Sequence, residues 1–257
     1  MGNWEFNDYF KSITNRRFDR NAGKIAEWHQ LRGGGGQIKI AMGRFFSLRL
    51  GAGYLNGWHE ADWWESHNRV NIPDYEYSLF SSIAPDRPFS RRLKLDLTAI
   101  PVEMDLYFGL GKRVQIFGGA GLGIYPLSLS YIEEVKWMAG FSSDNTMNIE
   151  ADFAAVAVGF NGSVGAELFL KPQLSVGCEF YFRFAESSDL TGQIVSINVN
   201  GTEGGHDADA ELVKKSFDSG DILIDVVSPG TADYYDVTPV TIGLGGIGTL
   251  ITFNLYF

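Results

Sequence analysis

Strict two-residue alternation near the C-terminal end of the chain is the feature that most constrains its fold. The odd positions carry Ile247, Thr249, Ile251, Phe253, Leu255 and Phe257, and the even positions carry Gly248, Leu250, Thr252, Asn254 and Tyr256. Because successive side chains of a strand point to opposite faces, the pattern predicts a strand with one apolar and one mixed face. Chain termini normally fray in water, so we expect the apolar face of this strand to lie against lipid.

The same alternation recurs along the rest of the chain, which predicts seven strands in total. The six others cover residues 36–42, 46–54, 91–108, 114–124, 154–170 and 174–184. Short turns that contain Gly or Pro alternate with long polar segments, which we expect to be loops at about 7–35, 57–90, 133–150 and 187–236. The sequence therefore predicts a single all-β domain over residues 1–257.

Composition limits the functions that are open to this chain. A net charge of −10 argues against nucleic acid as a partner, because phosphate binding needs a basic face. A single cysteine, Cys178, excludes an intramolecular disulfide and a cysteine-based metal site. No apolar run reaches the roughly 18–20 residues that a membrane helix needs. We expect neither a metal nor a cofactor.

The two faces of the predicted strands differ in a way that favours a membrane barrel. The face opposite the apolar one is rich in Gly, Ala and Ser, which fit the narrow interior of an eight-stranded barrel. The isolated charges on that face are Lys39, Arg49, Glu103, Asp105, Glu167, Glu179 and Arg183. Because both signs occur and buried charges need partners, we expect these seven residues to form an ion-pair network that plugs the lumen.

Aromatic residues gather near the predicted strand ends, where a membrane–water interface would lie. The candidates for this interfacial position are Tyr54, Trp58, Tyr107, Tyr131, Tyr256 and Phe257. The apolar face also changes parity near residues 99–101, 125–127 and 245–246. One extra residue inverts all later side chains, so we expect a β-bulge at each change, which would keep the apolar face outward throughout.

The alternation over residues 36–257, together with the terminal Phe257, resembles the small eight-stranded bacterial outer-membrane β-barrels of the OmpA/OmpX type. The resemblance implies an antiparallel, up-and-down transmembrane barrel in the bacterial outer membrane, with short periplasmic turns and long extracellular loops. The eighth strand would come from the N-terminal segment, where Trp4 and Phe6 alternate with Glu5 and Asn7.

The resemblance favours a structural or interaction role through the surface loops, without an open pore. Outer-membrane lipid would surround the barrel, and the surface loops are candidates for binding a protein partner. Lipopolysaccharide is a candidate partner of the basic first loop, but the favoured interpretation is a solvated loop that pairs with an acidic neighbouring loop. The first alternative is a lipid A acylase or deacylase, because Trp58–His67 contains His, Glu and Ser; however, no nucleophile elbow and no His-Glu-x-x-His motif is present. The second alternative is a soluble, calycin-like barrel that binds a ligand.

Overall fold

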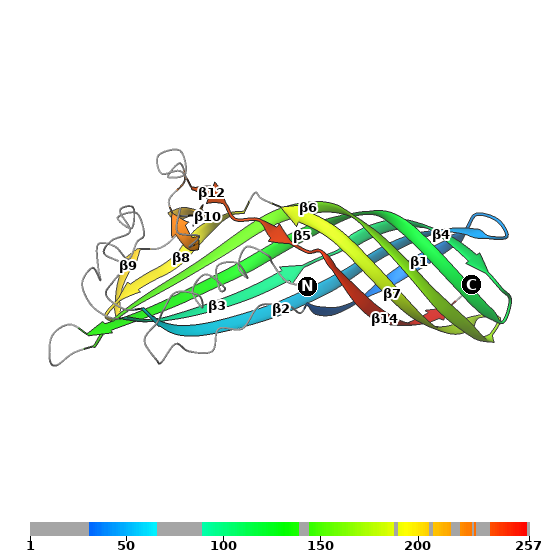
Figure 1. Cartoon of the computed structure of the whole chain (residues 1–257), viewed down its shortest axis with the longest axis horizontal. Coiled ribbons are helices and arrows are strands. Elements are labelled where there is room, and N and C mark those ends of the chain that lie inside the picture. Colours follow the sequence, from blue (N-terminus) through cyan, green and yellow to red (C-terminus); the bar gives the residue numbers. More distant parts are fainter. Residues whose placement is uncertain are drawn as a thin grey trace.

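The computed structural model describes residues 31–65, 89–138, 144–187, 190–205, 208–216, 222–227, 229 and 237–255. Within these ranges the protein is all β, and its strands form one antiparallel sheet (Figure 1), which confirms the predicted class. The strands are β1 (Arg32–Ala41), β2 (Phe46–Glu65), β3 (Phe89–Ala99), β4 (Val102–Leu110), β5 (Val114–Met138), β6 (Asp144–Lys171), β7 (Leu174–Ser187), β8 (Thr191–Val199), β9 (Thr202–Gly205), β10 (Ala208–Ser216), β11 (Ile222–Val227), β12 (Thr238–Pro239), β13 (Ile242–Gly243) and β14 (Gly246–Leu255).

The long strands follow one another as an antiparallel meander. β1 pairs with β2, β5 with β6, β6 with β7, and β7 with both β13 and β14. β3 and β4 are two segments of one strand, because each of them pairs with β2 on one side and with β5 on the other. The pairing order β2, β3, β5, β4 and back to β2 therefore forms a closed ring of these four strands. Beyond the end of β7, β8 continues along β6, and β10 lies between β8 and β11.

Short turns join the long strands at one end of the sheet. Residues 42–45, 111–113 and 172–173 connect β1 to β2, β4 to β5 and β6 to β7. These turns lie at the right-hand end of the molecule in Figure 1, whereas β8, β9, β10 and β12 lie at the left-hand end. The turns therefore occur where the Gly- and Pro-containing segments predict them.

The strands extend further from these turns than the sequence pattern predicts. β2 continues to Glu65, β5 continues to Met138 and β6 begins at Asp144, so parts of the loops predicted at 57–90 and 133–150 are strand. Cross-strand pairing with β3 and β6 stabilises these stretches, and their inward side chains, such as Val135, Met147 and Ile149, are buried.

The predicted first and last loops are also shorter than expected. β1 begins at Arg32 inside the predicted loop 7–35, and β8 to β11 lie inside the predicted loop 187–236. Within that predicted loop, residues 195–199 belong to β8 and residues 222–224 to β11, and β10 lies between these two strands. The strand predicted at Trp4–Asn7 lies outside the described residues.

The predicted β-bulges at the three parity changes are absent. The register between β2 and the β3–β4 strand is the same before and after residues 100–101, and the ladder bonds Gly53 N to Pro101 O (2.9 Å) and Ile100 N to Pro126 O (2.8 Å) cross the gap. β5 pairs with β6 without a shift through Pro126, and β7 keeps one register from β13 to β14. The prediction that the apolar face stays outward along the whole strand is therefore wrong.

The polarity of the two faces is exchanged instead. The last apolar outward row consists of the cross-strand partners Tyr54, Ile100, Pro126 and Val156. We call the part of the sheet between this row and the short turns the turn half, and the part beyond it the distal half. In the turn half apolar side chains face outward, whereas in the distal half they face inward.

The β3–β4 strand shows the exchange most clearly. In the distal half its inward residues Leu93, Leu95 and Leu97 are 1–2% exposed. In the turn half its outward residues Val102, Met104 and Leu106 are 43–52% exposed. Because the register is continuous, the sequence itself changes which face is apolar, and the backbone does not compensate. Among the described residues, no helix is long and apolar enough to cross a membrane.

Candidate functional site: the outer belt and the polar interior

Apolar side chains cover the outer surface of the turn half on every long strand. We call this surface the belt; its members include Ile38, Ile40, Leu50, Val102, Met104, Leu106, Ile116, Leu122, Ile124, Val158, Phe160, Val164, Phe180, Phe182, Ile247, Ile251 and Phe253. Ile38 is 67% exposed and Phe253 is 77% exposed, so the belt has no cover from the rest of the described chain. A soluble monomer rarely exposes an apolar surface of this extent.

Charged side chains occupy the interior behind the belt, and Arg49 lies at their centre. Its guanidinium contacts Asp105 at 2.6 Å and Glu179 at 2.8 Å, and it donates to the side-chain oxygen of Gln37 at 3.0 Å. The Tyr107 hydroxyl donates to Glu179 at 3.0 Å and is also hydrogen-bonded to Ser163. β2 and β7 are not neighbours in the sheet, so the contact between Arg49 and Glu179 crosses an interior around which the sheet curls.

Two further clusters complete this arrangement. Lys39 pairs with Glu167 at 3.3 Å, and Glu167 also accepts hydrogen bonds from Ser175 and from Asn254, the latter at 2.8 Å. These contacts bring β1 and β14, the two outer strands of the turn half, against β6. Arg183 pairs with Glu103 at 2.7 Å.

Each of the seven charges that the sequence pattern places in the lumen therefore has an ion-pair partner in one of these three clusters, which we together call the interior network: Lys39, Arg49, Glu103, Asp105, Glu167, Glu179 and Arg183. Sequence reasoning missed the uncharged side chains that bond to these charges or to one another, namely Gln37, Tyr107, Tyr125, Ser163, Ser175 and Asn254. Their inward parity beside the charged residues was the available signal.

Glycines on the inner face of β5 make room for these long side chains. A Cβ atom on Gly119 would lie 2.9 Å from the Tyr107 ring, and one on Gly123 would lie 2.5 Å from the Tyr125 hydroxyl. On Gly121 it would come within 2.0 Å of the Met104 carbonyl oxygen and 2.3 Å of Asp105 Oδ1. Large side chains of β4 and of β5 itself thus pack over these glycines, so side chains fill the narrow interior.

The interior of the distal half is apolar, in contrast to that of the turn half. Its buried side chains form one cluster, the plug, which includes Leu93, Leu95, Leu97, Leu127, Leu129, Tyr131, Phe153, Ile194, Leu212, Ile224, Val226 and Leu244. Further into the distal half lies a buried ion pair between Arg91 and Glu133, and Glu133 accepts a hydrogen bond of 2.6 Å from the Tyr131 hydroxyl. The plug thus separates two polar parts of the interior.

The aromatic residues predicted for a membrane interface divide into three groups. Tyr54 and Trp58 face outward and are 51% and 71% exposed, at the edge of the belt. Tyr107 and Tyr131 are 2% and 1% exposed on the inner face, so their predicted interfacial position is wrong. Their strand parity turns them inward, where their hydroxyl groups bond Glu179 and Glu133. Tyr256 and Phe257 lie outside the described residues.

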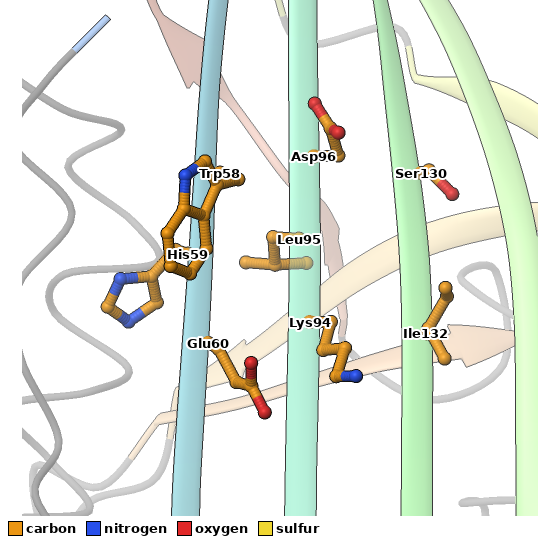
Figure 2. Close-up of a pocket in the computed structure, with 8 residues that line it drawn as sticks. All are labelled: Trp58, His59, Glu60, Lys94, Leu95, Asp96, Ser130 and Ile132. Atoms are coloured by element: carbon orange, nitrogen blue, oxygen red, sulfur yellow. The ribbon is translucent and has the colours of Figure 1, made fainter.

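A shallow pocket of about 200 Å³ lies next to the belt, on the outer wall of the distal half (Figure 2). Its lining includes the cross-strand partners Trp58, Asp96 and Ser130, which share the outer face. His59 belongs to the neighbouring row with Leu95 and Tyr131, which faces inward. His59 and Ser130 therefore lie on opposite faces of the sheet, so they do not form a Ser–His catalytic pair.

The outer wall beyond this pocket carries solvent-exposed ion pairs. Arg92 contacts Asp62 at 2.8 Å, Glu60 at 3.3 Å and Glu134 at 3.7 Å, and Lys136 contacts Glu134 at 2.8 Å. The hydrogen bond with Asp62 raises the pKa of the Arg92 guanidinium above its ordinary value. Charged residues outside and apolar residues inside are the arrangement expected for a sheet in water.

No metal site is apparent in the part of the chain that the structure describes, since no three His, Cys, Asp or Glu side chains there are grouped to hold an ion. His67, at the end of the segment Trp58–His67 that the enzyme alternative rests on, lies outside the described ranges. The comparisons with family models, curated proteins and solved structures found no match to this chain.

Proposed function

We propose that this protein is an integral outer-membrane β-barrel of eight strands, with a structural or interaction role at its distal end and no open pore. The observation that carries the proposal is the change in the polarity of the outer face from one row of cross-strand partners to the next. Outward residues change from apolar at Tyr54, Ile100 and Pro126 to polar at Asn56, Thr98 and Ser128, the next row. A change from apolar to polar residues at the same height on neighbouring strands is expected where the outer face crosses a lipid–water interface.

The height of the belt fits a bilayer. A transmembrane strand tilted by about 45° needs roughly 9–11 residues to cross the hydrocarbon core. On the β3–β4 strand the outward apolar positions run from Ile100 to Leu110, and on β7 they run from Leu174 to Phe184. Both stretches have this length, and the seven charges of the interior network lie behind them, away from the lipid. Glu186, the exposed cross-strand partner of Val158, is a charge that stays on the outer face near the boundary row.

Strand direction favours an eighth strand. β1 and β14 both run toward the short turns, and within the described residues β1 pairs only with β2 and β14 only with β7. Antiparallel closure between two strands that run in the same direction needs one further strand between them. The N-terminal segment at Trp4–Asn7 has the required alternation, and an eighth strand that includes it would pair with both edges, whose backbone groups lipid cannot satisfy.

Two layers of side chains argue against a pore. The interior network fills the turn half with paired charges, and the plug fills the distal half with apolar side chains that are almost fully buried. A water-filled path would have to pass both. We therefore place the proposed role at the surface of the distal half. This half would project from the membrane, and its polar outer face would contact lipopolysaccharide or a protein partner.

The alternative interpretations receive less support. A soluble calycin-like barrel explains the distal half, with its apolar interior, but would leave the belt of the turn half in water. Recovery of a detergent-free, soluble monomer would favour that alternative. The pocket gives the lipid-modifying enzyme no Ser–His pair, because its lining residues His59 and Ser130 occupy opposite faces.

The native Cys178 provides a direct test of the membrane placement. It is exposed on the outer face of β7 within the belt, and its cross-strand partners are Ala166 and Ile251. In protein reconstituted into lipid vesicles, we expect a membrane-impermeant maleimide to label Cys178 much more slowly than the matched variant Ser128→Cys in a Cys178→Ser background. Equal labelling rates at the two positions would place the belt in water and overturn the proposal.

Planar-bilayer recordings test the closed interior separately. We expect the unmodified protein to show no steady conductance. A steady ohmic current would mean that a continuous water path crosses the network and the plug, even if the labelling result supports the membrane placement.

A further inference from the structure

The three short turns at the end of the turn half all carry positive charge. Residues 41–47, 109–115 and 169–175, which contain these turns and the strand ends beside them, include neither Asp nor Glu. Their cations are all exposed, and we call them the basic rim: Arg44, Lys112, Arg113 and Lys171. This concentration of like charge contrasts with the net charge of the chain, which is −10.

Backbone hydrogen bonds place the turns side by side. Gly109 N donates to Phe45 O at 2.8 Å, which joins the first turn to β4. Phe169 N donates to Arg113 O at 2.9 Å, which joins the second turn to β6. The three turns lie together at the right-hand end of the molecule in Figure 1. The basic rim is therefore one surface and not a set of scattered charges.

Among the described residues, no carboxylate neutralises this surface. The ion pairs that these residues form with one another do not include any cation of the rim. Glu167 lies on the same strand as Lys171, but it is 1% exposed and faces the interior, where Lys39 and Ser175 bind it. The rim therefore presents its positive charge to the surroundings of the protein.

The cations of the rim follow directly on the belt. Met42, Leu110 and Leu170 are the last outward apolar residues of their strands, and they are 61%, 51% and 57% exposed. The next residue but one after Met42 is Arg44, and the residue after Leu170 is Lys171. If the belt spans the hydrocarbon core, as proposed above, the rim lies at the level of the lipid headgroups on the side of the short turns.

An aromatic cluster lies at the same level. Phe45, Phe46 and Phe108 are 41–49% exposed. The ring centroid of Phe108 lies 6.0 Å from that of Phe45 and 5.4 Å from that of Phe46. The Arg44 guanidinium lies 5.1 Å from the centroid of the Phe45 ring. Aromatic side chains are typical of the interface of a membrane barrel, and here one of them also holds a cation of the rim in place.

The distal edge of the belt has a different charge. On β3, β6 and β7 the outward charge closest to the last apolar outward row is a carboxylate, and these are Asp96, Asp152 and Glu186. The corresponding residue of β1 is Arg32. A purely basic edge is therefore a property of the turn end and not of both ends of the belt.

We propose that the basic rim binds the anionic phospholipid headgroups of the leaflet around the short turns, an inference that rests on the proposed membrane placement. Phosphate oxygens accept charge-assisted hydrogen bonds from guanidinium and ammonium groups. Lys and Arg clusters beside a membrane-spanning segment attract anionic lipid. A phospholipid in this leaflet meets the belt, the aromatic cluster and the cations together, whereas a soluble acidic protein would meet the cations alone.

The experiment measures the lipid preference of the full chain in phosphatidylcholine vesicles, with spin-labelled phosphatidylglycerol and spin-labelled phosphatidylcholine as probes. One Lys or Arg near an anionic surface strengthens the attraction by about fivefold at low salt. Because only part of the lipid shell contacts the rim, we expect an average preference for phosphatidylglycerol of roughly two- to fivefold. Raising the salt concentration should weaken this preference, since the rim is exposed to solvent.

Variants locate the preference on the protein. Replacement of all four cations of the rim by Gln should bring the association ratio close to one, and Lys112→Gln with Arg113→Gln should remove part of the preference. The charge-preserving pair Lys112→Arg and Lys171→Arg should retain it. The matched control Lys94→Gln removes an exposed cation from the outer wall of the distal half and should also retain it.

Equal association of the two lipids with the unmodified protein would overturn the proposal, as would a preference that survives the loss of all four cations. Binding of a soluble polyglutamate peptide that displaces the phosphatidylglycerol probe would assign the rim to an acidic protein partner and would also overturn it. Labelling of Cys178 in the same vesicles keeps the two proposals apart. Slow labelling without a lipid preference would refute the rim alone, whereas labelling as fast as that of Ser128→Cys would refute the membrane placement on which the rim depends.

Discussion

Removal of Arg49 provides the sharpest test of the energetics of the interior. The substitution Arg49→Met keeps an unbranched side chain of similar length but deletes the guanidinium that contacts Asp105 at 2.6 Å and Glu179 at 2.8 Å. Both carboxylates are almost fully buried, with side chains 1% and 2% exposed. Loss of one partner from a buried ion pair typically costs about 3–5 kcal/mol, because it leaves an uncompensated buried charge.

We therefore expect Arg49→Met to lower the free energy of unfolding by about 3–5 kcal/mol, since Tyr107 still donates to Glu179 and limits the loss. The matched control is Arg92→Met, which removes an ion pair of similar length, 2.8 Å to Asp62, from the solvent-exposed outer wall. The side chain of Arg92 is 44% exposed, whereas that of Arg49 is 8% exposed. An exposed pair contributes only about 0–1 kcal/mol, so the control should change stability little.

The assay is urea unfolding of both variants in the same detergent, followed by intrinsic fluorescence and analysed at constant slope. Similar small losses for the two variants would show that water solvates the stranded carboxylates. In that case the interior would be wet, and the argument for a side-chain-filled lumen would be wrong.

Three further predictions concern the glycines, the belt and the plug. Gly121→Val should destabilise the fold far more than Gly36→Val, because a Cβ at Gly121 meets a backbone oxygen at 2.0 Å while one at Gly36 meets nothing within 4 Å; unfolding midpoints of the two variants provide the comparison. Leu106→Arg should cost about 2–4 kcal/mol in vesicles, whereas Ser128→Arg beyond the belt should cost little, and equal losses would contradict the membrane boundary. Leu129→Ala, at a position that is 0% exposed within the plug, should cost about 2–5 kcal/mol, which a urea titration would measure; a loss under about 1 kcal/mol would mean that the distal interior is loosely packed.

The sequence pattern located the strands because side-chain alternation is a local property of an extended backbone. Each of the seven predicted stretches overlaps a strand, and the turns near Gly43, Gly111 and Pro172 lie where expected. The pattern could not set the outer limits of β2, β5 and β6. Residues such as Asp62 and Glu134 read as loop in isolation, and only pairing with β3 and β6 makes them strand.

The same alternation also fixed which residues share a face, and it is the reason that the seven network charges could be named. Lys39, Arg49 and Glu167 occupy positions opposite apolar neighbours on their own strands. However, their partners could not be predicted. Arg49 and Glu179 are 130 positions apart and lie on strands that do not pair, so their contact exists only because the sheet curls around an interior.

A change of parity along one strand has two physical meanings that the sequence alone does not distinguish. Either an extra residue bulges out and the apolar face stays on one side, or the register continues and the apolar face moves to the other side. The cross-strand partners decide between them, and the unshifted ladder at Ile100 and Pro126 selects the second. For this reason Tyr107 and Tyr131 face the interior. The sequence by itself determined that the polarity changes at these positions, whereas the tertiary structure decided that a single continuous sheet has an apolar exterior at one end and an apolar interior at the other.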